Sequence, residues 1–157
     1  MAPSIALQRF TTDLFRLLHE TFEQVEGIYL DRNTSLFETL ATICAEQASP
    51  PIGTGCASIA AQVNHVRFYL DVLQQYMRYE PPAEKIDWRE SWQIATVTPE
   101  TWQALQRSLR DSYQQLLALL HDFDTWEGEE EVGGAMACVV HTAYHLGEIR
   151  QALCFVR

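Results

Sequence analysis

Apolar residues along this chain recur at intervals of three and four, which is the spacing of one face of a helix. The repeat predicts long helices at about 3–25, 57–79 and 98–123 and after the acidic run 127–131. Thr98 and Pro99 form a typical helix start, a capping residue followed by a proline in the first turn. Pro81 and Pro82 forbid continuation of the second long helix. No alternating strand pattern competes, so the predicted fold class is all-α.

Two further segments complete the predicted fold. Ser35 followed by Glu38 has the pattern of a capping box, which predicts a shorter helix that runs through Ile43 and ends at Ser49. The segment 81–97 contains two tryptophans one turn apart and is predicted to be a folded connection with a short helix of its own. Four long helices with one or two short extra helices indicate a four-helix bundle.

Length and composition set the scale of this bundle. A chain of 157 residues with 47% hydrophobic content can bury a substantial core, and it predicts a single domain over 1–157. Its formal charge of -10, from 11 basic and 21 acidic residues, argues against nucleic acid and anionic membranes as partners. No segment is apolar over a length that would span a bilayer. The first residues also lack the basic stretch followed by an apolar stretch that is typical of a signal peptide, so we expect a cytoplasmic protein.

Three histidines are the candidate metal ligands. His141 and His145 lie four residues apart in the last predicted helix, so both imidazoles point from one face, about one turn apart. His65 lies near the middle of the second long helix and completes a three-histidine site if the two helices pack together. The alternative is that each histidine is hydrogen-bonded separately in the core. The combined spacing favours the metal site, although Thr142 after His141 excludes the H-E-x-x-H motif.

Polar residues near these histidines could contribute to the same site. On the last helix the spacing predicts one buried stripe: Gly134, Cys138, His141, His145, Glu148, Ala152 and Phe155. The other faces are also mostly apolar, so we expect a largely buried helix. Glu148 is a candidate fourth ligand, hydrogen-bond partner or general base. Cys138 could be a soft ligand. The alternative is that all four cysteines, Cys138 included, are reduced residues and that most of them are buried.

The chain resembles a known superfamily in three stretches. These are the mid-helix histidine in 62–70, the tryptophan-bearing connection in 87–92, and the terminal H-x-x-x-H-L-G-E-I-R-Q of 141–151. With these features the chain resembles the DinB/YfiT-like superfamily of four-helix-bundle metalloenzymes across nearly its whole length. The resemblance implies a four-helix bundle in which His65, His141 and His145 bind a divalent metal and leave coordination positions open.

The same resemblance implies a class of function. Members with assigned activities include metal-dependent transferases and isomerases that use a low-molecular-weight thiol, and a homodimer is implied as well. The ion could be zinc, nickel or iron, because imidazole suits several metals, and the small-molecule substrate is unknown. Many members have glutamine where this chain has Glu148. The alternative is a non-catalytic metal-binding or stress-response bundle that acts through dimerisation or a protein partner.

Overall fold

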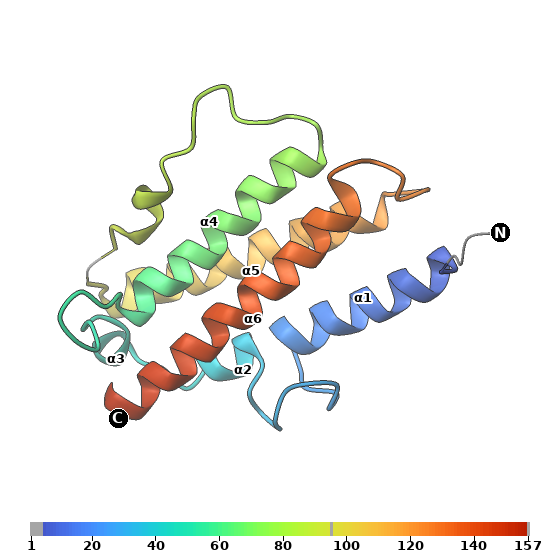
Figure 1. Ribbon diagram of the computed structural model, residues 1–157. Helices are drawn as coiled ribbons and strands as arrows, with labels where there is room; N and C mark the ends of the chain where they lie inside the picture. Colours follow the sequence, from blue (N-terminus) through green and yellow to red (C-terminus); the bar gives the residue numbers. More distant parts are fainter. Residues whose placement is uncertain (1–4, 95, 157) are drawn as a thin grey trace.

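The computed structural model describes residues 5–94 and 96–156, and these residues form helices joined by loops. Figure 1 shows the four long helices: α1 (Leu7–Phe22), α4 (Ile59–Met77), α5 (Pro99–His121) and α6 (Glu131–Val156). The short elements are α2 (Leu36–Leu40), α3 (Ala45–Ala48) and the 3-10 helix η1 (Trp88–Trp92). The prediction of an all-α bundle is confirmed.

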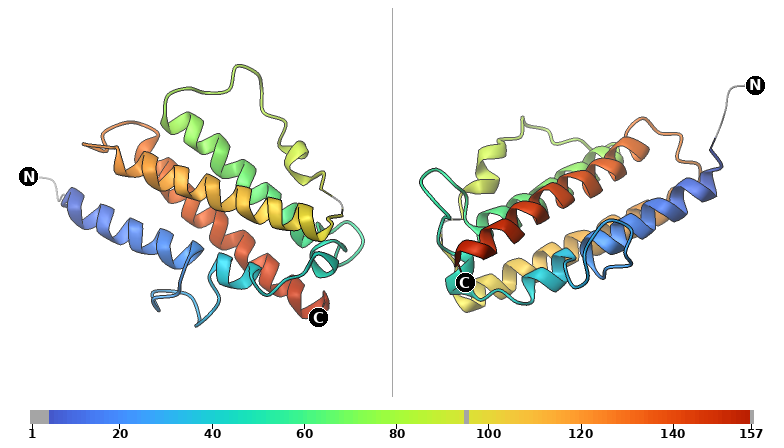
Figure 2. Two further views of the ribbon diagram at one scale, coloured as in Figure 1. Left: turned by 180° about the vertical axis from the view of Figure 1, so that it is seen from behind. Right: turned by 60° about the horizontal axis from the view of Figure 1, so that its bottom comes forward.

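The long helices form two layers. In the right-hand view of Figure 2, α4 and α6 lie side by side above α1 and α5. The helix α4 packs against both α5 and α6, and α1 packs against α6. Phe22 on α1 stacks on Tyr113 of α5 with ring centroids 4.3 Å apart, which closes the fourth side of the bundle.

The connection between α4 and α5 follows from the direction of these helices. Both run the same way in Figure 1, so the chain must return along the outside of α4 before α5 can begin. Trp88, in η1 on this return, contacts Phe68 edge to face at 5.8 Å. The folded connection predicted for 81–97 is therefore present in its described part and lies against α4, the helix that carries His65.

The helix predicted from Ser35 to Ser49 is interrupted. It divides into two short helices. Ser35 and Glu38 cap α2 as predicted, and Cys44, with an extended backbone, is the N-cap residue of α3. Between them the carbonyl of Ile43 accepts a hydrogen bond from the Trp102 indole at 2.7 Å. This tertiary hydrogen bond therefore satisfies a carbonyl at the point where the predicted helix is interrupted.

The first helix ends three residues before its predicted boundary. After Phe22 the chain turns around the carboxylate of Glu20, which is fully buried. Oε2 of Glu20 accepts the backbone N–H groups of residues 26 and 28, at 3.0 and 2.8 Å. Oε1 accepts those of residues 29 and 30, each at 2.7 Å. One side chain satisfies four backbone donors and so gives this loop a fixed shape. The spacing of apolar residues in the sequence does not predict that shape.

The predicted burial of α6 is partly wrong. Its buried side is centred on Thr142 and Ile149, one position along from the predicted stripe, because α1 and α4 cover only that side. Val140 and Phe155 are 65% and 67% exposed. Three of the four cysteines, at positions 44, 56 and 154, are also exposed rather than buried, and only Cys138 lies in the core. None of the described helices is long and apolar enough to cross a membrane.

Candidate metal centre

The packing of α4 against α6 brings the three predicted histidines together. His65 comes from α4, and His141 and His145 come from successive turns of α6. One ring nitrogen from each lies within 4.8 Å of the other two, and Nε2 of His65 is 3.1 Å from Nε2 of His141. Nitrogens bound to one tetrahedral zinc ion at about 2.0 Å are roughly 3.3 Å apart. The His65–His141 pair has this spacing, and the three nitrogens together are close enough that they could hold one ion.

The tautomer of His65 is fixed by the connection. Its Nδ1 lies 2.7 Å from Oγ of Ser91, whose own hydrogen is donated to the Trp88 carbonyl at 2.6 Å. Ser91 therefore accepts from His65, Nδ1 carries the ring hydrogen, and Nε2 keeps its lone pair for the centre. Trp92 stacks on the imidazole with centroids 3.9 Å apart and restricts its rotation.

His145 is oriented in the same way by different residues. Its Nδ1 lies 2.8 Å from Oε2 of Glu148 and 2.8 Å from Oε1 of Gln62. A carboxylate can only accept, so Nδ1 is again the protonated nitrogen and Nε2 is left with its lone pair. This arrangement of a carboxylate behind a histidine is common where histidine binds a metal, because it fixes the ring and raises its basicity.

Of the three histidines, His141 is the one with a buried ring nitrogen that the described protein groups leave unsatisfied. Its Nδ1 is buried and has no hydrogen-bond partner among the described residues. If Nδ1 carries the hydrogen, the lone pair on Nε2 faces the lone pair of His65; if Nε2 carries it, the buried Nδ1 lone pair has no donor. A cation at Nε2 removes the first conflict, so the donor set fits a divalent metal. Tyr69 stacks on this ring at 3.6 Å and nearly parallel, at 8°.

Burial keeps the three imidazoles neutral. Desolvation lowers the pKa of His65 to about 4 and that of His141 to about 3, with the neighbouring histidines adding to each shift. Burial also lowers the pKa of His145, although Glu148 acts in the opposite direction. Neutral imidazole is the form that binds metals, so all three side chains are ready as ligands at neutral pH.

The remaining candidates have different positions. Glu148 lies behind His145, at its Nδ1, rather than among the converging nitrogens. Cys138 is not in the group of converging atoms, and burial raises the pKa of its thiol to about 12, so it stays protonated. Ser91, Gln62 and the stacking of Trp92 were not identified from the sequence. The signal available was weak: Gln62 is a polar residue one turn before His65 in an apolar run, and Ser91 lies in the connection.

A cavity adjoins this centre on the side of Glu148. Its volume is about 590 Å³, and its walls include Gln62, Trp92 and Glu148, each of which contacts one of the histidines. The remaining walls come from α6 and from the loop before α4, and they include Ile52 and Tyr144. The cavity therefore reaches the partners of the histidines from outside.

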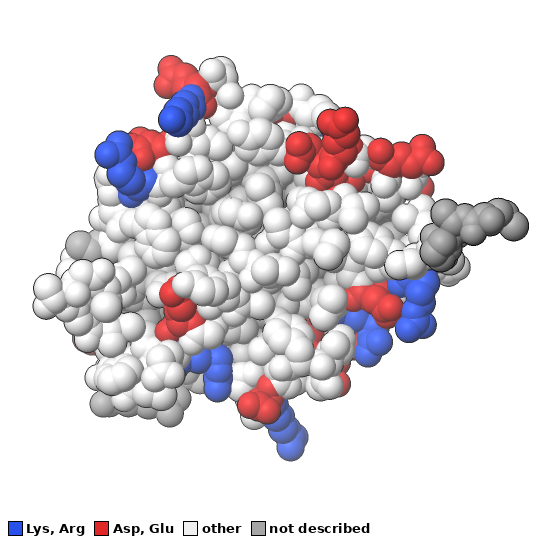
Figure 3. Space-filling view, viewed as in Figure 1, with Lys and Arg blue, Asp and Glu red and all other residues white. Residues whose placement is uncertain are grey.

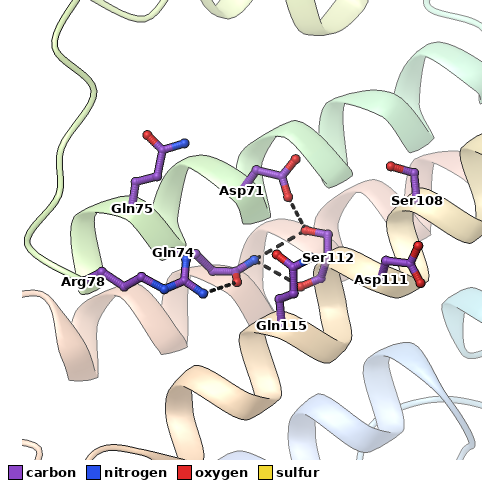
Figure 4. A pocket seen from close by; sticks show the side chains of 8 residues that line it. All are labelled: Asp71, Gln74, Gln75, Arg78, Ser108, Asp111, Ser112 and Gln115. Atoms are coloured by element: carbon purple, nitrogen blue, oxygen red, sulfur yellow. Dashed lines mark hydrogen bonds between the residues drawn. The ribbon is translucent and has the colours of Figure 1, made fainter.

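A second cavity of about 460 Å³ lies between α4 and α5, away from the histidines, and all 8 side chains drawn in Figure 4 are polar. Its buried groups are already paired with one another. Gln74 donates to Ser112 and accepts from Arg78, and Ser112 donates to Asp71. These groups connect the two helices and leave the cavity no unsatisfied buried group to bind a ligand.

The comparison with protein-family models identifies the family of this chain. The model of the DinB superfamily matches residues 29–149, most of the chain, including all three histidines and the connection. The chain belongs to the DinB superfamily. No curated protein and no solved structure matched in the corresponding comparisons. DinB-like proteins bind metals, and the three close histidines of this member could hold an ion.

Proposed function

We propose that this DinB-superfamily chain is a metal-dependent enzyme that acts on a small molecule. Its divalent ion is held by Nε2 of His65, His141 and His145. The observation that carries the proposal is the pair of outer hydrogen bonds, which leave a lone pair on Nε2 of His65 and of His145. The three rings each place a nitrogen within 4.8 Å of the others. Nε2 of His141 lies 3.1 Å from Nε2 of His65 and so belongs to the same group of nitrogens. A core built only for stability pairs such buried groups with protein partners.

Each side chain around the site has a separate role in this proposal. A divalent ion with three protein ligands has an open position at which water or a thiol is deprotonated near neutral pH. Ser91 and Gln62 hold the rings of His65 and His145 in place. Glu148 is both a partner of His145 and a wall of the cavity, so its carboxylate is the group placed to accept a proton from a substrate there.

The reaction class comes from the family. Thiol-dependent transfer or isomerisation needs a thiolate beside an electrophile, and a cavity next to the centre gives the second reactant a place to bind. Three neutral imidazoles suit zinc, nickel and iron alike. We therefore propose a thiol-dependent transferase or isomerase and leave the metal to measurement.

Metal content tests the proposal directly. Protein purified without a histidine tag should contain close to one equivalent of a divalent transition metal by elemental analysis. After chelation it should bind cobalt with the visible absorption of a tetrahedral or five-coordinate site, and a small thiol should change that spectrum. Absence of any metal binding to folded protein, judged by an unchanged helical circular dichroism spectrum, would remove the basis of the enzyme proposal.

A second candidate function is favoured by the outer face of α6. Met136, Val140 and Tyr144 are 50%, 65% and 63% exposed and lie four residues apart, and α2 does not cover them. Figure 3 shows that the centre of this face is mostly uncharged, with Lys, Arg, Asp and Glu mainly near its margin. We propose that two copies pair through this stripe, which would also serve a non-catalytic bundle that works by association.

Light scattering distinguishes the two states. A dimer should give twice the chain mass of 18.0 kDa, and Val140→Glu should return it to the monomer mass without loss of helix content. A wild-type mass equal to that of one chain at high concentration would reject pairing, and it would leave the metal proposal as it stands.

A further inference from the structure

The cavity beside the metal centre has an unusual balance of charge. Among the described residues that line it, Glu148 is the only one with a charged side chain, and neither lysine nor arginine contributes to the walls. The chain as a whole carries a formal charge of -10. An anionic ligand would therefore enter a cavity with no cation in its lining, and would meet a carboxylate there.

The side chains around Glu148 are suited to a cation. Trp92 and Tyr144 line the same cavity, and the aromatic face of either attracts an ammonium group. Glu148 uses Oε2 for its hydrogen bond to His145, and its side chain is 37% exposed, so the carboxylate remains accessible from the cavity. Ile52 and Ala57 supply apolar wall on the loop before α4.

We infer that this cavity binds a small organic cation, an ammonium-bearing molecule whose charged group lies at Glu148 beside the rings of Trp92 and Tyr144. The apolar part of the molecule packs towards Ile52. The inference rests on the proposed function in taking this cavity as the substrate pocket. It assigns the class of ligand from the walls alone, because those walls select against carboxylates and phosphates.

Three probes of one shape test the charge preference. Phenethylamine, phenethyl alcohol and hydrocinnamate share a phenyl ring and a short tail, and the tail is cationic, neutral or anionic. Their dissociation constants are measured by calorimetry in about 0.15 M salt, where the screening length is about 8 Å and distant surface charges contribute little. Each titration is run on chelated protein and on zinc-loaded protein.

Three variants locate the effect. Glu148→Gln removes the charge at the site and keeps the shape of the side chain. Glu130→Gln makes the same change in net charge on an exposed residue of the loop before α6. Gly147→Leu fills the cavity: a Cβ there meets no atom within 4 Å, so the backbone is not displaced, and leucine is a better helix former than glycine.

Zinc beside the cavity adds positive charge that favours the carboxylate, so the preference is judged on chelated protein. The expected result there is that the amine binds at least about tenfold more tightly than the carboxylate, with the alcohol between them. Glu148→Gln should reduce that ratio to about threefold or less, Glu130→Gln should leave it unchanged, and Gly147→Leu should weaken all three probes. Equal affinities, a preference for the carboxylate, no binding of any probe, or a preference that survives Glu148→Gln would each overturn the inference.

The two arms separate this inference from the proposed function. Zinc binding, together with no preference for the amine in chelated protein, means that the assigned ligand class is wrong while the metal proposal stands. A Glu148-dependent preference for the amine in protein that binds no zinc means that the cavity is correctly assigned and that the metal proposal has failed.

Discussion

Two groups of buried polar side chains in this molecule differ in how far protein groups satisfy their hydrogen bonds. Glu20, in the last turn of α1, has both carboxylate oxygens occupied by four backbone N–H groups. In the three histidines between α4 and α6, Nδ1 of His65 and of His145 is paired, while the buried Nδ1 of His141 has no partner among the described residues and the inner nitrogens converge on one another. Both groups are costly to bury, but only the first recovers that cost within the chain.

The difference teaches how to separate structure from function in a buried polar cluster. A group whose hydrogen-bonding capacity is filled by backbone atoms stabilises a loop and has nothing left to offer a ligand. A group that is firmly oriented and still unsatisfied is prepared for something that is not part of the polypeptide. Four measurements can break or sharpen this contrast.

The largest expected effect is on metal binding. His141→Ala should abolish the rise in melting temperature that zinc causes in the wild type. A metal at a hundredfold excess over its dissociation constant stabilises the folded state by about 2.7 kcal/mol, or roughly 5–10 °C for a chain of this size. His121→Ala, a change at an exposed histidine at the end of α5, is the control and should keep the full shift. Equal shifts in both variants would place the metal elsewhere.

Next in size is the effect of Glu20 on stability. Glu20→Gln presents an amide donor to backbone donors, and hydrogen bonds to a charged acceptor are worth about 1.5–3 kcal/mol each. We expect the free energy of unfolding to fall by about 2 kcal/mol in urea denaturation, with zinc affinity unchanged. Glu129→Gln, at an exposed residue, should leave both quantities as in the wild type. A loss of zinc affinity in Glu20→Gln would show that the two regions are not independent.

Acid sharpens the same contrast. Burial would raise the pKa of Glu20, but the four backbone donors outweigh it and hold this pKa at about 2, below the ordinary value of 4.5. A lowered folded-state pKa adds stability that is complete above 4.5 and is lost as the pH falls towards 2. The stability difference between wild type and Glu20→Gln should therefore be constant from neutral pH to about 5 and shrink below it. A difference that grows in acid contradicts the assignment.

The smallest expected effect is that of the outer partners. Ser91→Ala removes the acceptor that fixes the His65 ring, and loss of such a partner costs about 10- to 100-fold in metal affinity. The variant should bind zinc about tenfold more weakly and keep nearly the wild-type melting temperature after chelation. Ser108→Ala, at an exposed position on α5, should bind zinc as the wild type does. Unchanged affinity in Ser91→Ala would mean that Trp92 alone holds the ring.

The sequence was sufficient for the features that depend on local spacing. Helix periodicity predicted α4, α5 and α6 to within a few residues, and the spacing of His141 and His145, with His65 on another helix, predicted the cluster. Tertiary hydrogen bonds account for the rest. The break at Ile43 coincides with the hydrogen bond from Trp102, and the early end of α1 coincides with the hydrogen bonds to Glu20. Ser91 is a partner of His65 because the connection folds back along α4. The two residues are 26 positions apart in the sequence, and helix periodicity does not predict contacts at that separation.

The folded connection determines whether the site can bind an ion through three histidines or only through two. His65 is the only one of the three candidate ligands on α4, and its ring contacts Ser91 and Trp92 in η1. Asn64 makes the second hydrogen bond to this element, from Nδ2 to the Ser91 carbonyl at 2.8 Å. Local opening of η1 would therefore change a three-point chelate into a two-point one while the four long helices remain folded. The lifetime of a bound ion would then report the opening rate of this short segment, and not the unfolding rate of the bundle.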